Sequence, residues 1–138
     1  MEIPVRVKRL PHCPGLPSYA TLGSAGMDLR AAIDAPINMR AGQRWAIPTG
    51  LMIQIPVGYE GQIRARSGLA TKSGIGLANG IGTIDCDFRD EIIVLLINFG
   101  NVEYTIMPAA RIAQLIVAPC LRARWVEVED FGTPIFEI

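Results

Sequence analysis

The sequence predicts an all-β protein that closes as a jelly-roll-like barrel. Ten prolines and fourteen glycines punctuate its 138 residues at short intervals, which is typical of many short strands joined by turns. Between these breaks, apolar residues rarely recur at helical spacing. A sheet of this size must also close its edges, because open edges template aggregation, and closure favours a barrel or a double-sheet jelly roll.

The predicted strands are short runs rich in apolar and β-branched residues. In chain order they cover residues 3–9, 27–31, 43–48, 51–55, 59–65, 82–85, 92–98, 104–107, 112–119 and 123–128. Proline or glycine marks a turn at each of four breaks, residues 48–50, 56–58, 99–101 and 108–110. A single short helical turn is expected over residues 68–73.

Length and composition predict one domain over residues 1–138, built on one core, since half of the residues are apolar. Thirteen basic residues balance thirteen acidic ones, so no net field favours a nucleic-acid polymer. No apolar run approaches the roughly twenty residues of a membrane span, and no signal peptide is recognisable. Cys13, Cys86 and Cys120 are too scattered for a disulfide framework or a zinc site. We therefore expect a cytoplasmic protein.

Three predicted strands carry apolar residues on both faces rather than on one. They lie in residues 50–56, 91–98 and 111–119. In a protein with almost no helix, only another sheet or another subunit can cover the second face. This pattern predicts an oligomer.

The first candidate motif is the segment 24–31, in which small residues lead into a strand that carries Asp28 and Arg30. The two-residue spacing places both charged side chains on one face. The alternative is an ordinary solvated strand face.

The second motif is Arg66-Ser67-Gly68, at the expected start of the helical turn. Free backbone N–H groups there, together with a guanidinium and a hydroxyl, would bind phosphate oxygens. A serine that only caps the turn is the competing interpretation.

The third motif spans residues 77–91, where glycines flank Ile81 and two acids, Asp85 and Asp87, alternate around Cys86. On a strand these carboxylates would share one face beside a turn, where they could position a metal, orient a water or hold one proton between them. The alternative is an acidic hairpin tip kept soluble by its charge.

The fourth motif is the strand 111–117, in which Arg111 and Gln114 are the only strongly polar side chains. Polar groups that enter a core need partners, and these could be a ligand or each other. The one histidine, His12, lies in a predicted loop and is assigned no catalytic role.

Taken together and in order, these four segments resemble the motifs of the trimeric dUTPase family over residues 16–131. Residues 16–20 and 47–51 also resemble family sequence. The resemblance implies a jelly-roll homotrimer with three sites at subunit junctions. It further implies hydrolysis of dUTP to dUMP and pyrophosphate with Mg²⁺.

The resemblance also implies a role for each candidate residue. Asp85 would activate the water that attacks the α-phosphorus, and Asp28 would support the magnesium ion indirectly, through water. The other residues would bind the substrate: Arg66, Ser67, Gly68 and Gln114 the phosphate chain, Asn79, Thr83 and Ile84 the uracil, and the ring of Phe88 the deoxyribose.

The sequence departs from the family pattern at several points. Phe88 stands where tyrosine is usual, so a hydroxyl near the sugar is lost, while Ala65 for proline and Asp90 for glycine should be tolerated. The family continues into a glycine-rich closing arm with an arginine, whereas no basic residue follows Arg124 here. We therefore expect the arm to be shortened or absent and hydrolysis to be slow.

Two other functions stay open at this stage. A protein of this fold could bind dUTP or dUMP as a sensor or regulator without turnover, as the shortened arm would suggest. A relative that deaminates dCTP ranks lower, because the Ile84-Asp85 pair resembles dUTPases.

Overall fold

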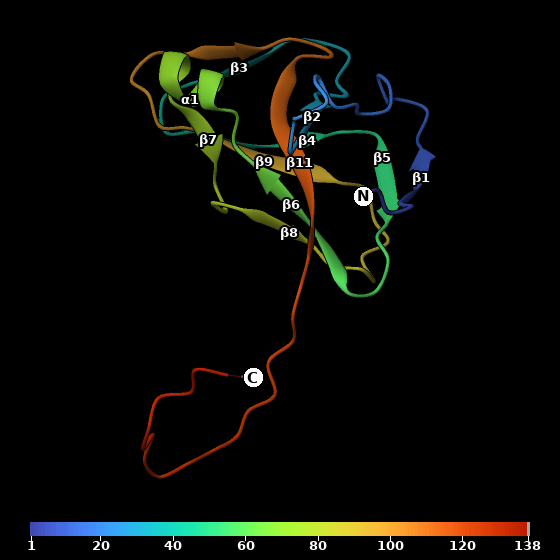
Figure 1. The fold of residues 1–138 in the computed structure, drawn as a ribbon. Helices are drawn as coiled ribbons and strands as arrows, with labels where there is room; N and C mark the ends of the chain where they lie inside the picture. Colours follow the sequence, from blue (N-terminus) through green and yellow to red (C-terminus); the bar gives the residue numbers. More distant parts are fainter. Residues whose placement is uncertain (138) are drawn as a thin grey trace.

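A computed structural model describes residues 1–137 and confirms the all-β prediction. Eleven strands and one short helix lie in this range (Figure 1). Their bounds are β1 Arg6–Arg9, β2 Met27–Arg30, β3 Ile37–Met39, β4 Arg44–Pro48, β5 Leu51–Gln54, β6 Tyr59–Arg64, α1 Ser67–Ser73, β7 Ile75–Leu77, β8 Gly82–Ile84, β9 Ile93–Asn98, β10 Tyr104–Ile106 and β11 Arg111–Pro119.

The strands form two main antiparallel sheets and two smaller pairs. The larger sheet has the order β2-β11-β6-β8, and the second has the order β4-β9-β7. The remaining strands pair as β1 with β5 and β10 with β3. Strand β11 is the longest element and bonds to a neighbour on each side, as its apolar and β-branched sequence favours.

The hydrophobic core lies between the sheets, and strand β9 shows how the pleat divides its residues. Val94, Leu96 and Asn98 are buried, whereas Ile93 and Leu95 remain 36% and 39% exposed. The alternation follows the two-residue period of a strand. The outward face of β9 is therefore apolar and is not covered by the described part of this chain.

Most predicted elements coincide with observed ones, and the exceptions have physical causes. The helical turn expected at 68–73 is α1, which ends at Gly74 in the left-handed conformation. Strands β3 and β7 were not predicted, because three residues are too few to show a periodic pattern.

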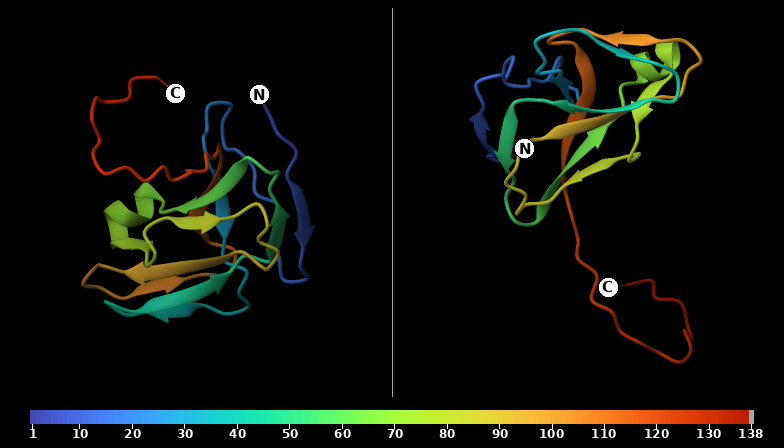
Figure 2. Two further views of the ribbon diagram at one scale, coloured as in Figure 1. Left: turned by 90° about the horizontal axis from the view of Figure 1, so that it is seen from below. Right: turned by 180° about the vertical axis from the view of Figure 1, so that it is seen from behind.

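The strand predicted at residues 123–128 is wrong for the isolated chain. Residues 120–137 contain no strand, and beyond Cys120, whose N–H still donates to the Gly58 carbonyl, the chain extends away from the body, as the right-hand view of Figure 2 shows. A strand needs a partner for its backbone groups, and no described segment of this chain lies beside the projecting residues. We call residues 121–137 the C-terminal segment.

The helix α1 has seven residues. Across residues 1–137, no helix is long and apolar enough to cross a membrane.

Asn98 yields the first testable prediction, because its buried side chain joins three backbone groups. Its amide nitrogen donates to the carbonyls of Met39 (3.0 Å) and Val102 (2.9 Å), and its oxygen accepts from the Gly100 N–H (2.9 Å). Asn98→Ala leaves these groups unpaired and should lower the free energy of unfolding by about 2–4 kcal/mol.

The measurement is urea unfolding at an unchanged m-value, with the exposed Asn38→Ala as the control, expected to lose less than about 1 kcal/mol. An equal loss in the two variants would contradict the assignment.

Candidate functional site

The second sequence motif, Arg66-Ser67-Gly68, lies between the end of strand β6 in the larger sheet and the first turn of α1. Strand β6 ends at Arg64, and Arg66 keeps an extended backbone (φ −90°, ψ 127°) just before α1 begins at Ser67. The first N–H groups of a helix have no partner within the helix, and no side chain caps this helix at Arg66. Ser67 and Gly68 are both exposed, so the hydroxyl and these backbone groups face a possible ligand.

The side chain of Asp28 holds two arginines at this place. Asp28 Oδ1 accepts a hydrogen bond from Arg66 Nε at 2.9 Å, and Asp28 Oδ2 lies 3.6 Å from Arg111 Nη1. Arg66 Nη1 also donates to the backbone carbonyl of Arg111 at 3.4 Å. Two guanidinium groups share one carboxylate, so the cluster keeps a net positive charge that favours an anion.

Gln114 is positioned from both sides of its side chain. Its Nε2 donates to the carbonyl of Ala65 at 3.0 Å. On the other side, a Cβ atom added to Gly26 would meet Gln114 Oε1 at 2.5 Å. Gly26 thus leaves room for the amide, which explains a glycine immediately before β2.

These side chains line one cavity of about 320 Å³. The structure therefore brings together five of the predicted residues, Asp28, Arg66, Ser67, Gly68 and Gln114. The opposite wall is the run Ser24-Ala25-Gly26, with Ala20 beside it. Sequence reasoning gave this wall no role, although its run of small residues was the available signal. We call this cavity the anion cradle.

A second cavity of about 380 Å³ lies next to the anion cradle and shares Ala20 and Asp28 with it. Arg30 and Arg111 both line it, and they face each other across the β2–β11 ladder. Arg30 Nη1 donates to the carbonyl of Ala109 at 3.0 Å. The side chain of Arg111 is more than half exposed and contacts the Asp28 carboxylate, so it remains accessible from this cavity.

The residues of the third motif form a separate group around β8. Asp85 follows the end of β8, and the Phe88 N–H donates to the Asp85 carbonyl at 3.1 Å, which closes a turn. Asp85 and Asp87 are both exposed, and Phe88 is half-buried against the core. The prediction that the two carboxylates share a strand face is therefore wrong, because Cys86 and Asp87 lie in the turn.

The predicted uracil-binding residues also lie in this group. Gly80 has φ +74° and its N–H donates to the Leu77 carbonyl at 3.1 Å, so Asn79 is presented on an exposed turn. Strands β7 and β8 belong to different sheets, so the expected hairpin is a crossing between sheets. Thr83 is exposed, whereas the Ile84 side chain is buried.

Strand β8 is an edge strand among the described residues, bonded to β6 alone. The backbone groups on its free edge are therefore available to a planar hydrogen-bonding ligand.

The Asp85 turn and the anion cradle lie toward opposite ends of β6. Ile84 pairs with Gly61 near the start of this strand, whereas Arg66 follows its last residue. At about 3.3 Å per residue, roughly 15–20 Å of strand separates the Asp85 turn from the anion cradle. One chain does not bring Asp85 to its own cradle.

Potential metal ligands are sparse. No group of three or more His, Cys, Asp or Glu side chains within residues 1–137 could hold a metal ion. Asp28 is the only acidic residue that lines the anion cradle, and the two arginines already contact its oxygens. The donor set does not fit a metal held directly by the protein, and it fits only a hydrated ion that a ligand brings with it.

Gly26 provides a test of the anion cradle. The Cβ of Gly26→Ala would displace Gln114, the flexible end of which can move, so stability should change by less than about 1 kcal/mol. Pyrophosphate binding should weaken roughly three- to tenfold, since one positioned amide donor is lost.

Calorimetry with pyrophosphate measures the affinity. The control is Gly23→Ala, because a Cβ there meets no atom within 4 Å. Equal affinities of the two variants would show that Gln114 plays no part in anion binding.

Comparisons with known proteins are consistent with this arrangement. The dUTPase family model matches residues 15–134. A curated relative, the deoxyuridine 5'-triphosphate nucleotidohydrolase of Aquifex aeolicus, is 52% identical over 123 residues, which cover 88% of this chain and 82% of the relative.

Solved structures support the fold assignment. A mutant dUTPase from phage phi11 of S. aureus, described with a structural Mg(II) ion, has a TM-score of 0.83 at 20% identity and covers 95% of this chain and 100% of its own. A mutant of Staphylococcus bacteriophage 80alpha dUTPase with dUpNHpp has a TM-score of 0.85 at 22% identity, covering 96% and 92%. At these identities the likeness establishes the fold, which is the jelly-roll-like fold of dUTPases. From the family model and the curated relative, the chain belongs to the dUTPase family.

Proposed function

We propose that this chain is a dUTP diphosphatase that hydrolyses dUTP to dUMP and pyrophosphate. The observation that carries the proposal is the anion cradle, in which Asp28, Arg66 and Gln114 come from three separate segments. The family assignment and the name of the curated relative supply the substrate. A nucleotide bound to the cited phage enzyme is consistent with that choice.

The cradle binds the phosphate chain through Arg66, Ser67, Gly68 and Gln114. Arg66 Nε donates a hydrogen bond to Asp28, and this contact fixes the orientation of the guanidinium. Its terminal nitrogens can then donate to phosphate oxygens. A Cβ at Gly68 would meet no atom of the chain within 4 Å. The chain itself therefore does not require glycine there, and close approach of a phosphate gives a reason for it.

Asp85 acts as the base that removes a proton from the attacking water. The water oxygen attacks the α-phosphorus, the bond to the bridging oxygen of pyrophosphate breaks, and the proton passes to the Asp85 carboxylate. Its place on a turn closed by the Phe88 N–H fixes the backbone from which the carboxylate projects.

Asp28 assists Mg²⁺ indirectly, through water molecules. Asp28 is the only acidic residue among the described residues that lines the cradle, so an ion there would be held mainly by the triphosphate and by water. When bound, it would draw negative charge from the phosphate oxygens. Asp28 would accept hydrogen bonds from its hydration shell while it orients Arg66.

The base and the sugar are bound by the second group of residues. Asn79 and the backbone at Thr83 and Ile84 bind the uracil edge, supported by the free edge of β8. A backbone fixed by Gly80 and the β6–β8 ladder resists the reversed donor pattern of cytosine. The ring of Phe88 packs beneath the deoxyribose.

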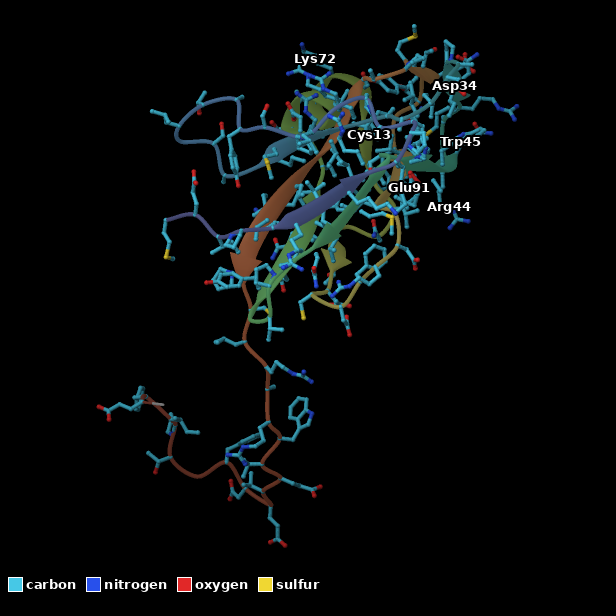
Figure 3. The ribbon with its side chains drawn as sticks, turned by 90° about the vertical axis from the view of Figure 1, so that its right-hand side faces the viewer. Cys13, Asp34, Arg44, Trp45, Lys72 and Glu91 are labelled. Carbon is cyan, nitrogen blue, oxygen red and sulfur yellow. The ribbon has the colours of Figure 1, made fainter. Side chains whose placement is uncertain are left out.

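We propose that the active assembly is a homotrimer with each site shared between copies. The separation of the Asp85 turn from the cradle within one chain supports a shared site. The uncovered Ile93 and Leu95 on β9, with exposed apolar residues of the C-terminal segment, supply surface for association: Leu121, Trp125, Val126, Val128 and Phe131. Figure 3 shows side chains of that segment projecting with no other part of the chain beside them.

We take residues 1–138 as one domain that acts in the cytoplasm, where the three free cysteines within the described range would stay reduced. Within residues 121–138, Arg122 and Arg124 are the only basic residues and Gly132 is the only glycine. Binding of dUTP without turnover is the second candidate, and the exposed C-terminal segment is the feature that favours it.

The base assignment is tested with Asp85→Asn. This substitution should lower kcat for Mg²⁺-dependent pyrophosphate release from dUTP at least about a hundredfold, because the amide cannot accept the proton, while nucleotide affinity changes little. Asp87→Asn, the neighbouring exposed carboxylate, should retain activity. Turnover that survives in Asp85→Asn would rule out this mechanism, and a wild-type chain that binds dUTP without releasing pyrophosphate would select the second candidate.

Phe88→Tyr tests the sugar contact. Restoring the hydroxyl should raise the ratio of kcat/KM for dUTP over UTP several-fold, since a positioned hydrogen-bonding group discriminates between sugars. Steady-state rates with both nucleotides measure the ratio. An unchanged ratio would remove Phe88 from sugar selection.

A further inference from the structure

Residues 85–92, which include Asp85 and Phe88, connect β8 of the larger sheet to β9 of the second sheet. The first half of this segment is held by the β6–β8 ladder and by the turn from Asp85 to Phe88. Arg89 adds hydrogen bonds from Nη1 to the carbonyls of Cys86 and Phe88, both at 2.8 Å. The Arg89 hydrogen bonds are local and shape the turn itself, while the ring of Phe88 packs against the hydrophobic core.

Glu91 attaches the far end of this segment. Its Oε1 accepts a hydrogen bond from the Gly50 N–H at 2.9 Å, in the turn between β4 and β5. The next residue is fastened to the same turn, because the Ile92 N–H donates to the Leu51 carbonyl at 2.8 Å and the Ile92 carbonyl accepts from the buried Thr49 hydroxyl at 2.7 Å. Glu91 is half-buried, which strengthens its hydrogen bonds relative to a fully solvated carboxylate.

His12 joins the same carboxylate from a third segment. His12 Nε2 contacts Glu91 Oε1, the oxygen that also accepts from Gly50. Either the neutral imidazole with its proton on Nε2 or the imidazolium can donate this hydrogen bond. The Glu91 side chain, labelled in Figure 3 together with Cys13, thus lies between the N-terminal loop and the β4–β5 turn.

The N-terminal loop does not depend on His12 for its own position. The Leu10 N–H donates to the Gly50 carbonyl at 2.8 Å. Gly50 has φ +70°, and a Cβ there would come within 2.5 Å of Cys13 Cα, so Cys13 packs directly on the turn. Loss of the imidazole should therefore leave the loop docked while it frees one side of Glu91.

We propose that His12 and Glu91 are a positioning pair for the Asp85 turn, in which the imidazole holds the carboxylate that anchors the turn's return to β9. The role of the pair in turnover rests on the proposed function. The attachment itself is a property of the protein without nucleotide.

The test is His12→Ala, with two readouts. By NMR, amide hydrogen exchange at Phe88 and Ile92 should accelerate roughly three- to tenfold, because the anchor of the segment is weakened. Exchange at Gly74, whose N–H donates to the Ala70 carbonyl at the end of α1, should not change. In turnover, kcat should fall several-fold while KM for dUTP stays within about threefold, since the anion cradle is untouched.

Two variants provide the controls. His12→Gln places an amide nitrogen near the position of Nε2 and should restore both readouts, which a purely steric role would not predict. Thr105→Ala removes a different exposed side-chain hydrogen bond, to Asn38 at 2.9 Å, and should change neither.

Exchange at Phe88 and Ile92 that stays unchanged in His12→Ala, or that rises equally in Thr105→Ala, would overturn the proposal. Failure of His12→Gln to restore both readouts would overturn it as well. If the wild-type chain releases no pyrophosphate, the proposed function fails, and the exchange measurement still decides the positioning role.

Discussion

The length of strand β6 is the constraint on which the candidate site depends. The strand pairs with β8 near its start and leads into Arg66 at its end, so it keeps the Asp85 turn and the anion cradle roughly 15–20 Å apart. Neither group is flexible enough to cross that distance, because ladders, turns and the Asp28–Arg66 contact hold each in place. The proposed site would therefore combine the cradle of one copy with the Asp85 turn of another.

The exposed apolar surface of the chain also favours association between copies. Ile93 and Leu95 alternate with core residues on β9, and the C-terminal segment carries Trp125 and Phe131 at 91% and 95% exposure. Burying such side chains contributes about 1.5–3 kcal/mol each, so a second copy that covers them would stabilise the assembly. The same contact between two copies would then both bury these apolar side chains and complete the site.

Much of the fold could be predicted from the sequence, because proline and glycine punctuation marks the ends of strands directly. The chemistry of the cradle could be predicted in part, since Arg66, Ser67 and Gly68 lie next to one another in sequence. Contacts between distant segments could not, and the Asp28–Arg66 and His12–Glu91 contacts depend on the sheet order. The turn at Asp85 was mistaken for a strand because alternating acids mimic its two-residue period. A strand at 123–128 would need a neighbour that residues 1–137 of a single chain do not provide.

A shared site is tested most directly by mixing two inactive variants. Arg66→Ala loses the cradle and Asp85→Asn loses the base, so neither homo-oligomer should release pyrophosphate from dUTP. Refolding the two chains together in equal amounts should restore up to about one quarter of wild-type activity, since that fraction of interfaces pairs an intact cradle with an intact Asp85. Refolded mixtures as inactive as the separate variants would contradict a site divided between copies of the chain.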